Sequence, residues 1–349
     1  MSEQRLRIID ANLNRAGEGL HLLEEMARLT LDDAELTRKL KTMRHEVLRG
    51  DLAFNKELIQ ARDSESDVGA DIEVPGEEGR GLPIIVVANA HRVQEALRIL
   101  EEMARVPDKT LPLDPEKFKK ARFDLYNIER ALISRLLRRD KSGRLSGLYA
   151  IIDSQKLGGR KHIEVAGQLV RGGAKAVQLR YKGDDRDELL SISQQLKSLC
   201  YESSVLFIVN DYLDIALAVG ADGLHLGQRD LPIKEARRLL PIDMLLGVSV
   251  TTVEQAKAAE GGGADYIAVG SMYPTSSKET AKVVGPERLR EVRGAVSLPL
   301  VAIGGINRDN AGEVAAAGAD GVAVISAILG AEDMEGAARQ LVKAFEAGK

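Results

Sequence analysis

The second part of the chain alternates between short apolar runs rich in branched residues and longer stretches with helical periodicity. Eight such runs follow residue 147. They are Leu148–Ile152, Ala176–Leu179, Val205–Val209, Gly223–Leu226, Leu245–Val248, Tyr266–Val269, Leu300–Ile303 and Val322–Ile325. Repeated alternation of strand and helix is typical of a parallel sheet with right-handed crossovers. Eight strands within about 200 residues favour a closed (β/α)8 barrel, the TIM barrel, over an open sheet.

Glycines mark the ends of the helices in this region. The tripeptide Gly-Ala-Asp ends at Asp222, Asp265 and Asp320, each time just before an expected strand, and Gly172-Gly-Ala occupies a similar place. A helix often ends in a left-handed residue, a backbone conformation that glycine adopts without strain. The repeated tripeptide therefore supports the barrel.

The first 140 residues have helical periodicity and contain an internal repeat. Asn12-x-x-Arg15-x-x-Glu18 returns 77 residues later as Asn89-x-x-Arg92-x-x-Glu95, and each copy continues into Leu-x-x-Leu-Glu-Glu-Met-Ala-Arg. Two copies of a helix pair predict a pseudo-symmetric bundle in which each half covers the apolar face of the other. The chain is thus predicted to be α/β, with a helical domain over 1–140, a linker over 141–146 and a barrel over 147–349.

Composition excludes several classes of partner. The net charge is −4 and neither half is basic, so neither a nucleic acid nor an anionic membrane is an expected partner. No apolar run approaches the ~20 residues of a membrane span, and the first residues do not resemble a signal peptide. The single cysteine, Cys200, rules out an internal disulfide and is expected to be buried. A cytoplasmic location is expected.

Polar residues follow the ends of most of these apolar runs. Gln178 lies near the end of the second run, Arg180 and Lys182 follow it, and Asn210-Asp211 follows the third. The carboxyl ends of barrel strands meet at one rim, so these side chains are expected to converge. Asp211 and Asp230 together are suitable ligands for Mg²⁺, which combines a few carboxylates with water and phosphate oxygens. Helix N-capping is the alternative explanation for either aspartate alone.

The cations and glycines at this rim indicate phosphate chemistry. Arg180, Lys182 and Lys278 could neutralise a diphosphate as it departs, with Asn210 and Ser249 as neutral donors. Gly304-Gly305 and Ile325-Ser326 follow the last two runs, where barrels of this kind commonly bind a monophosphate, although glycines there also serve tight turns. Two anion sites in one barrel mouth suggest two phosphorylated substrates.

These segments together resemble the thiamine phosphate synthases, also called thiamine-phosphate pyrophosphorylases, over roughly residues 147–345. The segments that carry the resemblance are Gln178-Leu-Arg-x-Lys182, Asn210-Asp211, His225-Leu-Gly-Gln-x-Asp230, Gly247-Val-Ser249, Tyr273-Pro-Thr-x-Ser-Lys278, Gly304-Gly-Ile306 and Ile325-Ser326. The chain has Ser277 where the family commonly has threonine, and both residues offer a hydroxyl. The resemblance implies a transferase that joins hydroxymethylpyrimidine diphosphate to thiazole phosphate and releases pyrophosphate.

Roles follow from the resemblance, position by position. Asp211 and Asp230 would bind Mg²⁺. The pyrimidine diphosphate would be held by Gln178, Arg180, Lys182, Asn210, Ser249 and Lys278, of which Arg180, Lys182, Ser249 and Lys278 would act on the reacting groups. The thiazole phosphate would be held by Thr275, Ser277, Gly305, Ile325 and Ser326. The chemistry requires charge stabilisation and positioning, so no catalytic histidine is assigned, and His225 is expected to pack inside the barrel.

Two alternatives remain for the barrel. A related thiazole tautomerase has the same fold but needs an imidazole base shortly after the Gly-Val-Ser segment, where this chain has Thr251-Thr252. A barrel that binds phosphorylated ligands without turnover is the other. Asp211, Asp230 and Lys278 favour the synthase, since neither alternative needs a site for a leaving group.

The amino-terminal part resembles a domain fused to thiamine phosphate synthases and associated with hydroxymethylpyrimidine phosphate kinase activity. This resemblance implies ATP as a further ligand, although the chain has no Gly-x-x-x-x-Gly-Lys-Ser/Thr loop and no protein-kinase signature. A structural or dimerising module, which would make the protein a homo-oligomer, is the alternative. The repeated Asn, Arg and Glu residues could line a cleft, with Arg44-His45, Arg62-Asp63 and Asp67-Val-Gly69 as further contributors, or could form ion pairs that fix the bundle.

Overall fold

The computed structural model describes residues 3–62, 81–107, 113–275 and 282–349. The chain divides into two compact units, Met1–Leu137 and Arg138–Lys349. The helix that contains this division, α5 (Pro115–Gly143), extends three residues into the segment 141–146 that was predicted as a linker. The helical unit and the barrel are described separately below.

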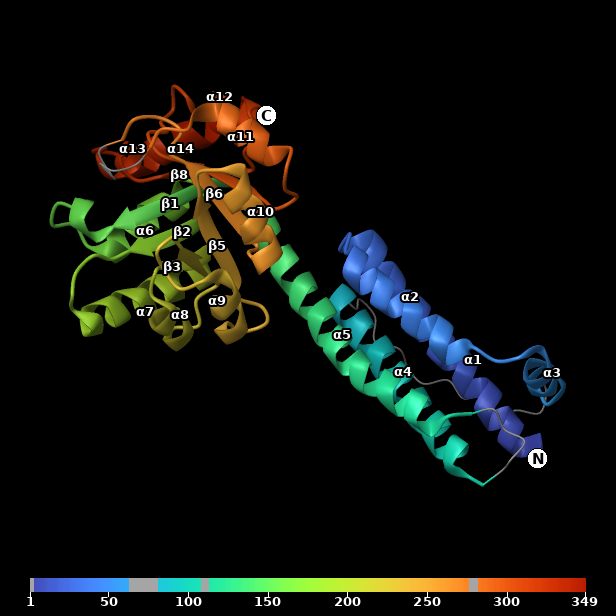
Figure 1. The fold of residues 1–349 in the computed structure, drawn as a ribbon. Helices are drawn as coiled ribbons and strands as arrows, with labels where there is room; N and C mark the ends of the chain where they lie inside the picture. Colours follow the sequence, from blue (N-terminus) through green and yellow to red (C-terminus); the bar gives the residue numbers. More distant parts are fainter. Residues whose placement is uncertain (1–2, 63–80, 108–112, 276–281) are drawn as a thin grey trace. The chain divides into compact units, whose positions relative to one another are not determined.

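The described residues of the first unit form helices (Figure 1). Its elements are α1 (Glu3–Glu25), a π-helical turn (Met26–Thr30), α2 (Ala34–Leu48), α3 (Leu52–Gln60), α4 (Leu82–Arg105) and the first part of α5. Asp33 caps α2 by accepting hydrogen bonds from the backbone N–H groups of Glu35 and Leu36, as the polar residue before a helix commonly does. Asp51 caps α3 in the same way through Phe54.

The internal repeat is visible in the packing of this unit. The repeated leucines of α1 and α4, Leu20 with Leu97 and Leu23 with Leu100, are fully buried in its core. A second similarity follows each copy of the repeat, Leu40-Lys-x-x-Arg44 in α2 and Phe118-Lys-x-x-Arg122 in α5, and it also has a structural counterpart. Glu24 of α1 pairs with Arg44 of α2 at 3.0 Å, and Glu101 of α4 pairs with Arg122 of α5 at 3.0 Å. In each copy of the helix pair, a buried glutamate on the first helix therefore pairs with an arginine at the equivalent position of the second helix.

The second unit is a closed barrel of eight parallel strands, as predicted (Figure 1). The strands are β1 (Gly147–Asp153), β2 (Ala174–Arg180), β3 (Leu206–Asn210), β4 (Gly223–Leu226), β5 (Leu245–Val250), β6 (Tyr266–Gly270), β7 (Leu300–Ile303) and β8 (Gly321–Val324). Each strand pairs with the next in sequence, and β8 closes the barrel on β1.

Helices lie outside the strands and bury their apolar faces against them. They are α6 (His162–Arg171), α7 (Arg186–Glu202), α8 (Leu213–Ala218), α9 (Ile233–Leu239), α10 (Val253–Gly262), α11 (Gly285–Arg293), α12 (Ala311–Ala316), α13 (Ser326–Leu329) and α14 (Met334–Glu346). Cys200 of α7 is fully buried in this layer, and burial raises the pKa of its thiol to about 12. The thiol is therefore protonated and unreactive at neutral pH. Among the described residues, no helix is both long and apolar enough to cross a membrane.

The repeated Gly-Ala-Asp segments have a role beyond helix termination. Gly220 and Gly318 adopt positive φ angles of 59° and 98°, as the helix-end prediction requires. The aspartates then reach back to the start of the preceding strand. The carboxylates of Asp222, Asp265 and Asp320 accept hydrogen bonds from the first or second backbone N–H of β3, β5 and β7, and each also pairs with a cation from a neighbouring helix, Lys197, Arg237 or Arg293. These three aspartates tie adjacent strands together at the amino-terminal end of the barrel, away from the strand ends that carry the polar residues.

Candidate functional site

A cavity of about 870 Å³ opens at the carboxyl ends of the barrel strands. Every predicted site residue that the structure describes lies on its wall. These are Gln178, Arg180, Lys182, Asn210, Asp211, Asp230, Ser249, Thr275, Gly305, Ile325 and Ser326. Ser277 and Lys278 lie outside the described residues. The cavity wall also includes Lys282, a cation that the sequence analysis did not single out.

Two cations of the cavity are held by carboxylates. Arg180 Nη1 lies 2.5 Å from Asp153 Oδ2, and Lys182 Nζ lies 2.6 Å from Asp211 Oδ2. Asp153 ends β1, and its side chain is only 1% exposed, so it fixes the direction of Arg180 from behind the cavity wall. Asp153 was not predicted from the sequence, although it lies at the end of a strand as the predicted residues do.

Asp211 and Asp230 lie next to each other on the cavity wall. Burial raises the pKa of the Asp230 carboxyl, and the nearby Asp211 carboxylate raises it further, whereas the backbone N–H of Gly227, 2.7 Å from Asp230 Oδ2, opposes the shift. Neither residue caps a helix, because the residues before α8 and α9 are Tyr212 and Pro232. The N-capping explanation is therefore wrong.

The carboxylates of Asp211 and Asp230 are suitable ligands for Mg²⁺. The described residues contain no group of three or more histidine, cysteine, aspartate or glutamate side chains that could hold a metal ion. Two adjacent carboxylates leave most coordination positions to water and to substrate oxygens, which is how proteins usually bind Mg²⁺ when the substrate is a phosphate ester.

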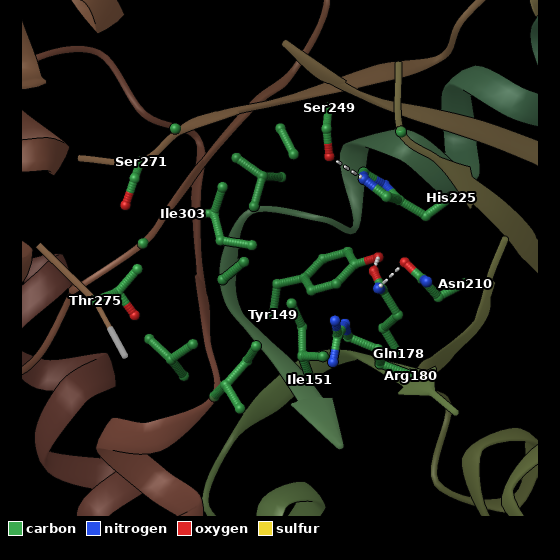
Figure 2. A pocket seen from close by; sticks show the side chains of 18 of the residues that line it. Tyr149, Ile151, Gln178, Arg180, Asn210, His225, Ser249, Ser271, Thr275 and Ile303 are labelled. Carbon is green, nitrogen blue, oxygen red and sulfur yellow. Dashed lines mark hydrogen bonds between the residues drawn. The ribbon is translucent and has the colours of Figure 1, made fainter. Parts of the chain in front are cut away.

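A continuous chain of hydrogen bonds crosses the inner end of the cavity, and Figure 2 shows most of its members. In order, it joins Asn210, Gln178, Tyr149, Tyr266, His225 and Ser249, with successive distances of 2.8, 2.7, 2.9, 3.1 and 2.9 Å. Tyr149, Tyr266 and His225 are buried. Sequence reasoning missed both tyrosines because tyrosine within a strand has no specific functional signal.

The direction of this chain follows from its members. Gln178 donates from Nε2 to Asn210, and its Oε1 accepts from the hydroxyl of Tyr149. With the Tyr149 proton used, the Tyr266 hydroxyl must donate to Tyr149 and accept from Nδ1–H of His225. Nε2 of a neutral imidazole is then an acceptor, so Ser249 donates to it. The ends of the chain therefore differ: Asn210 keeps amide N–H groups for a ligand, and Ser249 keeps oxygen lone pairs.

His225 is positioned to order this chain rather than to transfer protons. The residue is buried, and burial lowers the pKa of the imidazole to about 4. A neutral ring at pH 7 that already uses both nitrogens has no free site for a reacting proton. The structure thus places His225 inside the barrel, as predicted.

The two glycines after β7 are required by the local backbone. Gly304 and Gly305 have φ angles of 99° and 66°, and a Cβ at Gly305 would lie 2.5 Å from the carbonyl oxygen of Pro274. The tight-turn explanation for these glycines therefore holds independently of any ligand. Because the segment with Gly305 packs closely against the segment with Pro274, Gly305 and Thr275 line the same side of the cavity.

A second cavity, of about 440 Å³, lies on the helical unit between α1 and α4. It is lined by Asn12, Arg15, Glu18, Arg92, Glu95, Ala96 and Ile99. Five of the six repeated polar residues therefore line one cleft, as one of the two hypotheses predicted, while Asn89 does not. Inter-helix ion pairs, the second hypothesis, are also present, but they join Glu24 to Arg44 and Glu101 to Arg122 rather than the repeated Asn, Arg and Glu residues. Asp63 and Asp67-Val-Gly69 lie outside the described residues.

Comparison with known proteins agrees with both parts of this description. Residues 148–328 match the family model described as thiamine monophosphate synthase, and residues 7–131 match the model of the ThiD2 family. A thiamine-phosphate synthase of Thermosynechococcus vestitus is 38% identical over 350 residues, which cover 99% of this chain and 97% of the relative. One from Methanospirillum hungatei is 53% identical over 195 residues, 56% of this chain and 95% of the relative.

Among solved structures, thiamine phosphate pyrophosphorylase from Pyrococcus furiosus aligns with a TM-score of 0.55 and 42% identity, covering 59% of this chain and 98% of that protein. The T. vestitus relative matches the barrel and the helical unit together, and the barrel carries the residues by which the resemblance was first identified. The chain belongs to the thiamine-phosphate synthase family, with an amino-terminal unit that belongs to the ThiD2 family.

Proposed function

We propose that the barrel condenses 4-amino-2-methyl-5-hydroxymethylpyrimidine diphosphate with 4-methyl-5-(2-phosphoethyl)thiazole, giving thiamine phosphate and pyrophosphate with the help of Mg²⁺. The observation that carries this proposal is the set of side chains that line the cavity of about 870 Å³. Cations, an adjacent pair of carboxylates and neutral hydrogen-bonding groups face a single space that is large enough for two small substrates.

The ends of the hydrogen-bond chain suit the edge of an aminopyrimidine. Such a ring presents an amino group, which donates, beside ring nitrogens, which accept. Ser249 offers an acceptor and Asn210 offers donors, because the two tyrosine hydroxyls and the His225 ring between them bond to one another and to their neighbours in the hydrogen-bond chain. This arrangement would orient the ring and direct its reactive CH₂ carbon towards the thiazole.

The diphosphate would lie against the charged side of the cavity. Arg180 and Lys182 would neutralise the oxygens of the departing pyrophosphate, together with Lys278 beyond the described residues. Asp211 and Asp230 would hold Mg²⁺, whose charge would stabilise the same leaving group. The thiazole phosphate would bind beside Thr275, Gly305 and Ser326. The C–O bond of the pyrimidine diphosphate would break first, releasing pyrophosphate and leaving a cation on the CH₂ carbon, and the thiazole nitrogen would then attack this carbon. No side-chain base is needed, in keeping with the neutral, fully bonded His225.

The decisive test follows product formation from the two purified substrates, with and without Mg²⁺. We expect thiamine phosphate and pyrophosphate in equal amounts, and a loss of about 10–100-fold or more in Asp211→Ala when Mg²⁺ is limiting. Asp243→Ala is a matched control, because Asp243 pairs with Lys141 outside the cavity. Absence of product from the folded wild-type protein would contradict the proposal and leave the tautomerase or a binding role.

For the helical unit we propose phosphorylation of hydroxymethylpyrimidine phosphate by ATP. Two observations support it: the match of residues 7–131 to the ThiD2 family and the charged cavity between α1 and α4. Its product would be the diphosphate that the barrel consumes. A structural or dimerising module remains the alternative.

The kinase is tested in the full chain carrying Asp211→Ala, which blocks consumption of the diphosphate. Incubation with ATP and hydroxymethylpyrimidine phosphate is expected to yield ADP and the pyrimidine diphosphate, measured by chromatography. If the protein forms no more ADP in the presence of hydroxymethylpyrimidine phosphate than in its absence, the kinase proposal is rejected. Light scattering of the same sample would then show whether the protein is a homo-oligomer, as the alternative predicts.

A further inference from the structure

The cavity between α1 and α4, the α1–α4 groove, is formed by the repeated residues Asn12, Arg15, Glu18, Arg92 and Glu95. At Gly19 and Val93, the residues that follow Glu18 and Arg92 in the sequence, the two helices are in close contact, since a Cβ added at Gly19 would lie 2.5 Å from Cγ2 of Val93. Glycine therefore brings the two backbones together, and the longer polar side chains on either side of the contact surround a space.

The charged residues of this groove are not part of the unit's ion-pair framework. The carboxylate of Glu101, for example, contacts Arg98, Arg105 and Arg122. Arg and Glu three residues apart on a helix commonly pair. Within the described part of the chain, however, no ion pair or hydrogen bond is present for Arg15, Glu18, Arg92 or Glu95, all of which line the groove. Their charges remain available to a ligand.

A buried amide gives independent evidence for a ligand. Asn12 is only 4% exposed, and it donates from Nδ2 to the carbonyl of Ile8 at 2.8 Å. Its Oδ1 is buried and has no hydrogen-bond partner. A buried acceptor without a hydrogen bond is destabilising, so a donor is expected to reach it. Asn89, its counterpart in the repeat, makes the same backbone bond at 2.9 Å but is only half-buried and lies outside the groove.

The chemistry of the groove specifies a class of ligand. Two guanidinium groups from opposite helices can bind a phosphate dianion with several charge-assisted hydrogen bonds. Asn12 Oδ1 and the carboxylates of Glu18 and Glu95 all accept hydrogen bonds, and therefore suit amino groups. The volume of about 440 Å³ falls within the range of small-molecule sites, roughly 300–1,000 Å³.

We infer that the α1–α4 groove binds a phosphate monoester of an amino-substituted heterocycle, with Arg15 and Arg92 on the phosphate and Asn12 on the amino group. The inference deepens the proposed kinase function, on which the choice of probe rests. The internal duplication then has a functional reason, because it supplies one arginine and one glutamate from each copy to a single site.

Calorimetric titration of the full-length protein with hydroxymethylpyrimidine phosphate tests the groove. Arg15→Gln and Arg92→Gln are each expected to weaken one binding event by at least tenfold, and Asn12→Ala to weaken it less. Arg98→Gln is the control, since Arg98 is an exposed arginine of α4 that pairs with Glu101 and Glu102 and does not line the groove. All variants share an unaltered barrel, so binding there cancels in the comparison. Thermal melting of each variant verifies folding.

The outcomes separate this site from the kinase reaction. Binding that depends on Arg15 and Arg92 supports the site, even when ATP yields no ADP, in which case the kinase proposal alone fails. Unchanged binding in both arginine variants overturns the site. ADP formation that continues at the wild-type rate in both variants also overturns it, while leaving the kinase itself in place.

Discussion

Tyr266 is the central link of the hydrogen-bond chain at the inner end of the barrel cavity. Its hydroxyl lies 2.9 Å from that of Tyr149 and 3.1 Å from Nδ1 of His225, and all three residues are buried. At the residue scale, the consequences of this chain can be tested by removing one oxygen atom.

We predict that Tyr266→Phe lowers the free energy of unfolding of the barrel by about 1–3 kcal/mol, because the buried Nδ1–H of His225 loses its acceptor. The KM for the pyrimidine diphosphate should rise more than kcat falls, since Ser249 is no longer oriented. Denaturant titration and steady-state kinetics measure both. Tyr273→Phe is the control, because its hydroxyl bonds Glu313 near the surface. Equal effects in the two variants would contradict a special role for Tyr266.

The state of His225 gives a second prediction. Burial lowers the pKa of its imidazole from 6.5 to about 4, so the folded protein keeps the ring neutral where the unfolded chain binds a proton. Stability from this group is therefore full above about pH 6.5 and is lost as the pH falls towards 4. Nitrogen NMR should show a proton on Nδ1 and no titration of the ring between pH 7 and 5. A titration midpoint near 6.5 would refute the buried, neutral assignment.

At the scale of elements, the three Gly-Ala-Asp aspartates join strands to helices, and their exposure differs. The Asp265 side chain is 11% exposed and receives Arg138, Arg237 and the backbone N–H of Leu246. The Asp320 side chain makes the same kind of contacts but is 45% exposed. Water can therefore replace many of the hydrogen bonds and ion pairs that Asp320 makes, but few of those that Asp265 makes.

We predict that Asp265→Ala destabilises the barrel by about 3–5 kcal/mol, since it leaves two partly buried arginines and a strand N–H without their partner. Asp320→Ala should cost about 1 kcal/mol, as is usual for a more exposed pair. Thermal and denaturant unfolding of the two variants provide the comparison. A larger loss of stability in Asp320→Ala than in Asp265→Ala would show that the exposure of the aspartate does not control its contribution to stability.

At the scale of the whole molecule, the two units have separate hydrophobic cores. The apolar cluster of the helical unit includes Leu20, Leu97 and Phe118 and contains no residue of the barrel, while the barrel clusters contain no residue before Leu145. Separate cores favour independent unfolding, because the cooperativity of folding comes from shared buried contacts.

We therefore predict two transitions in differential scanning calorimetry of the full chain. Asp265→Ala should lower the temperature of the barrel transition and leave the other in place. Glu101→Ala should do the reverse, because Glu101 is buried and pairs with three arginines of the helical unit. A single transition that both variants move by the same amount would show that the units unfold together.

The amino-acid sequence alone predicted the barrel, the duplicated helical unit and those site residues that line the two cavities. It could do so because strand periodicity is local and because the carboxyl ends of parallel strands always meet at one rim, so that Gln178, Asp211 and Ser249 could be placed together without coordinates. A 77-residue repeat likewise predicted that Arg15 and Arg92 occupy equivalent positions.

Which of these residues pair with one another depends on contacts that exist only in the folded chain. Asp153 and Tyr266 have no distinctive sequence pattern, and their roles arise from contacts with Arg180 and His225 across the barrel. Similarly, sequence chemistry could not distinguish a glutamate in an ion pair, Glu101, from one that lines a groove, Glu95. Pairing depends on distances between helices, which close packing of the apolar residues sets and which a one-dimensional pattern does not contain.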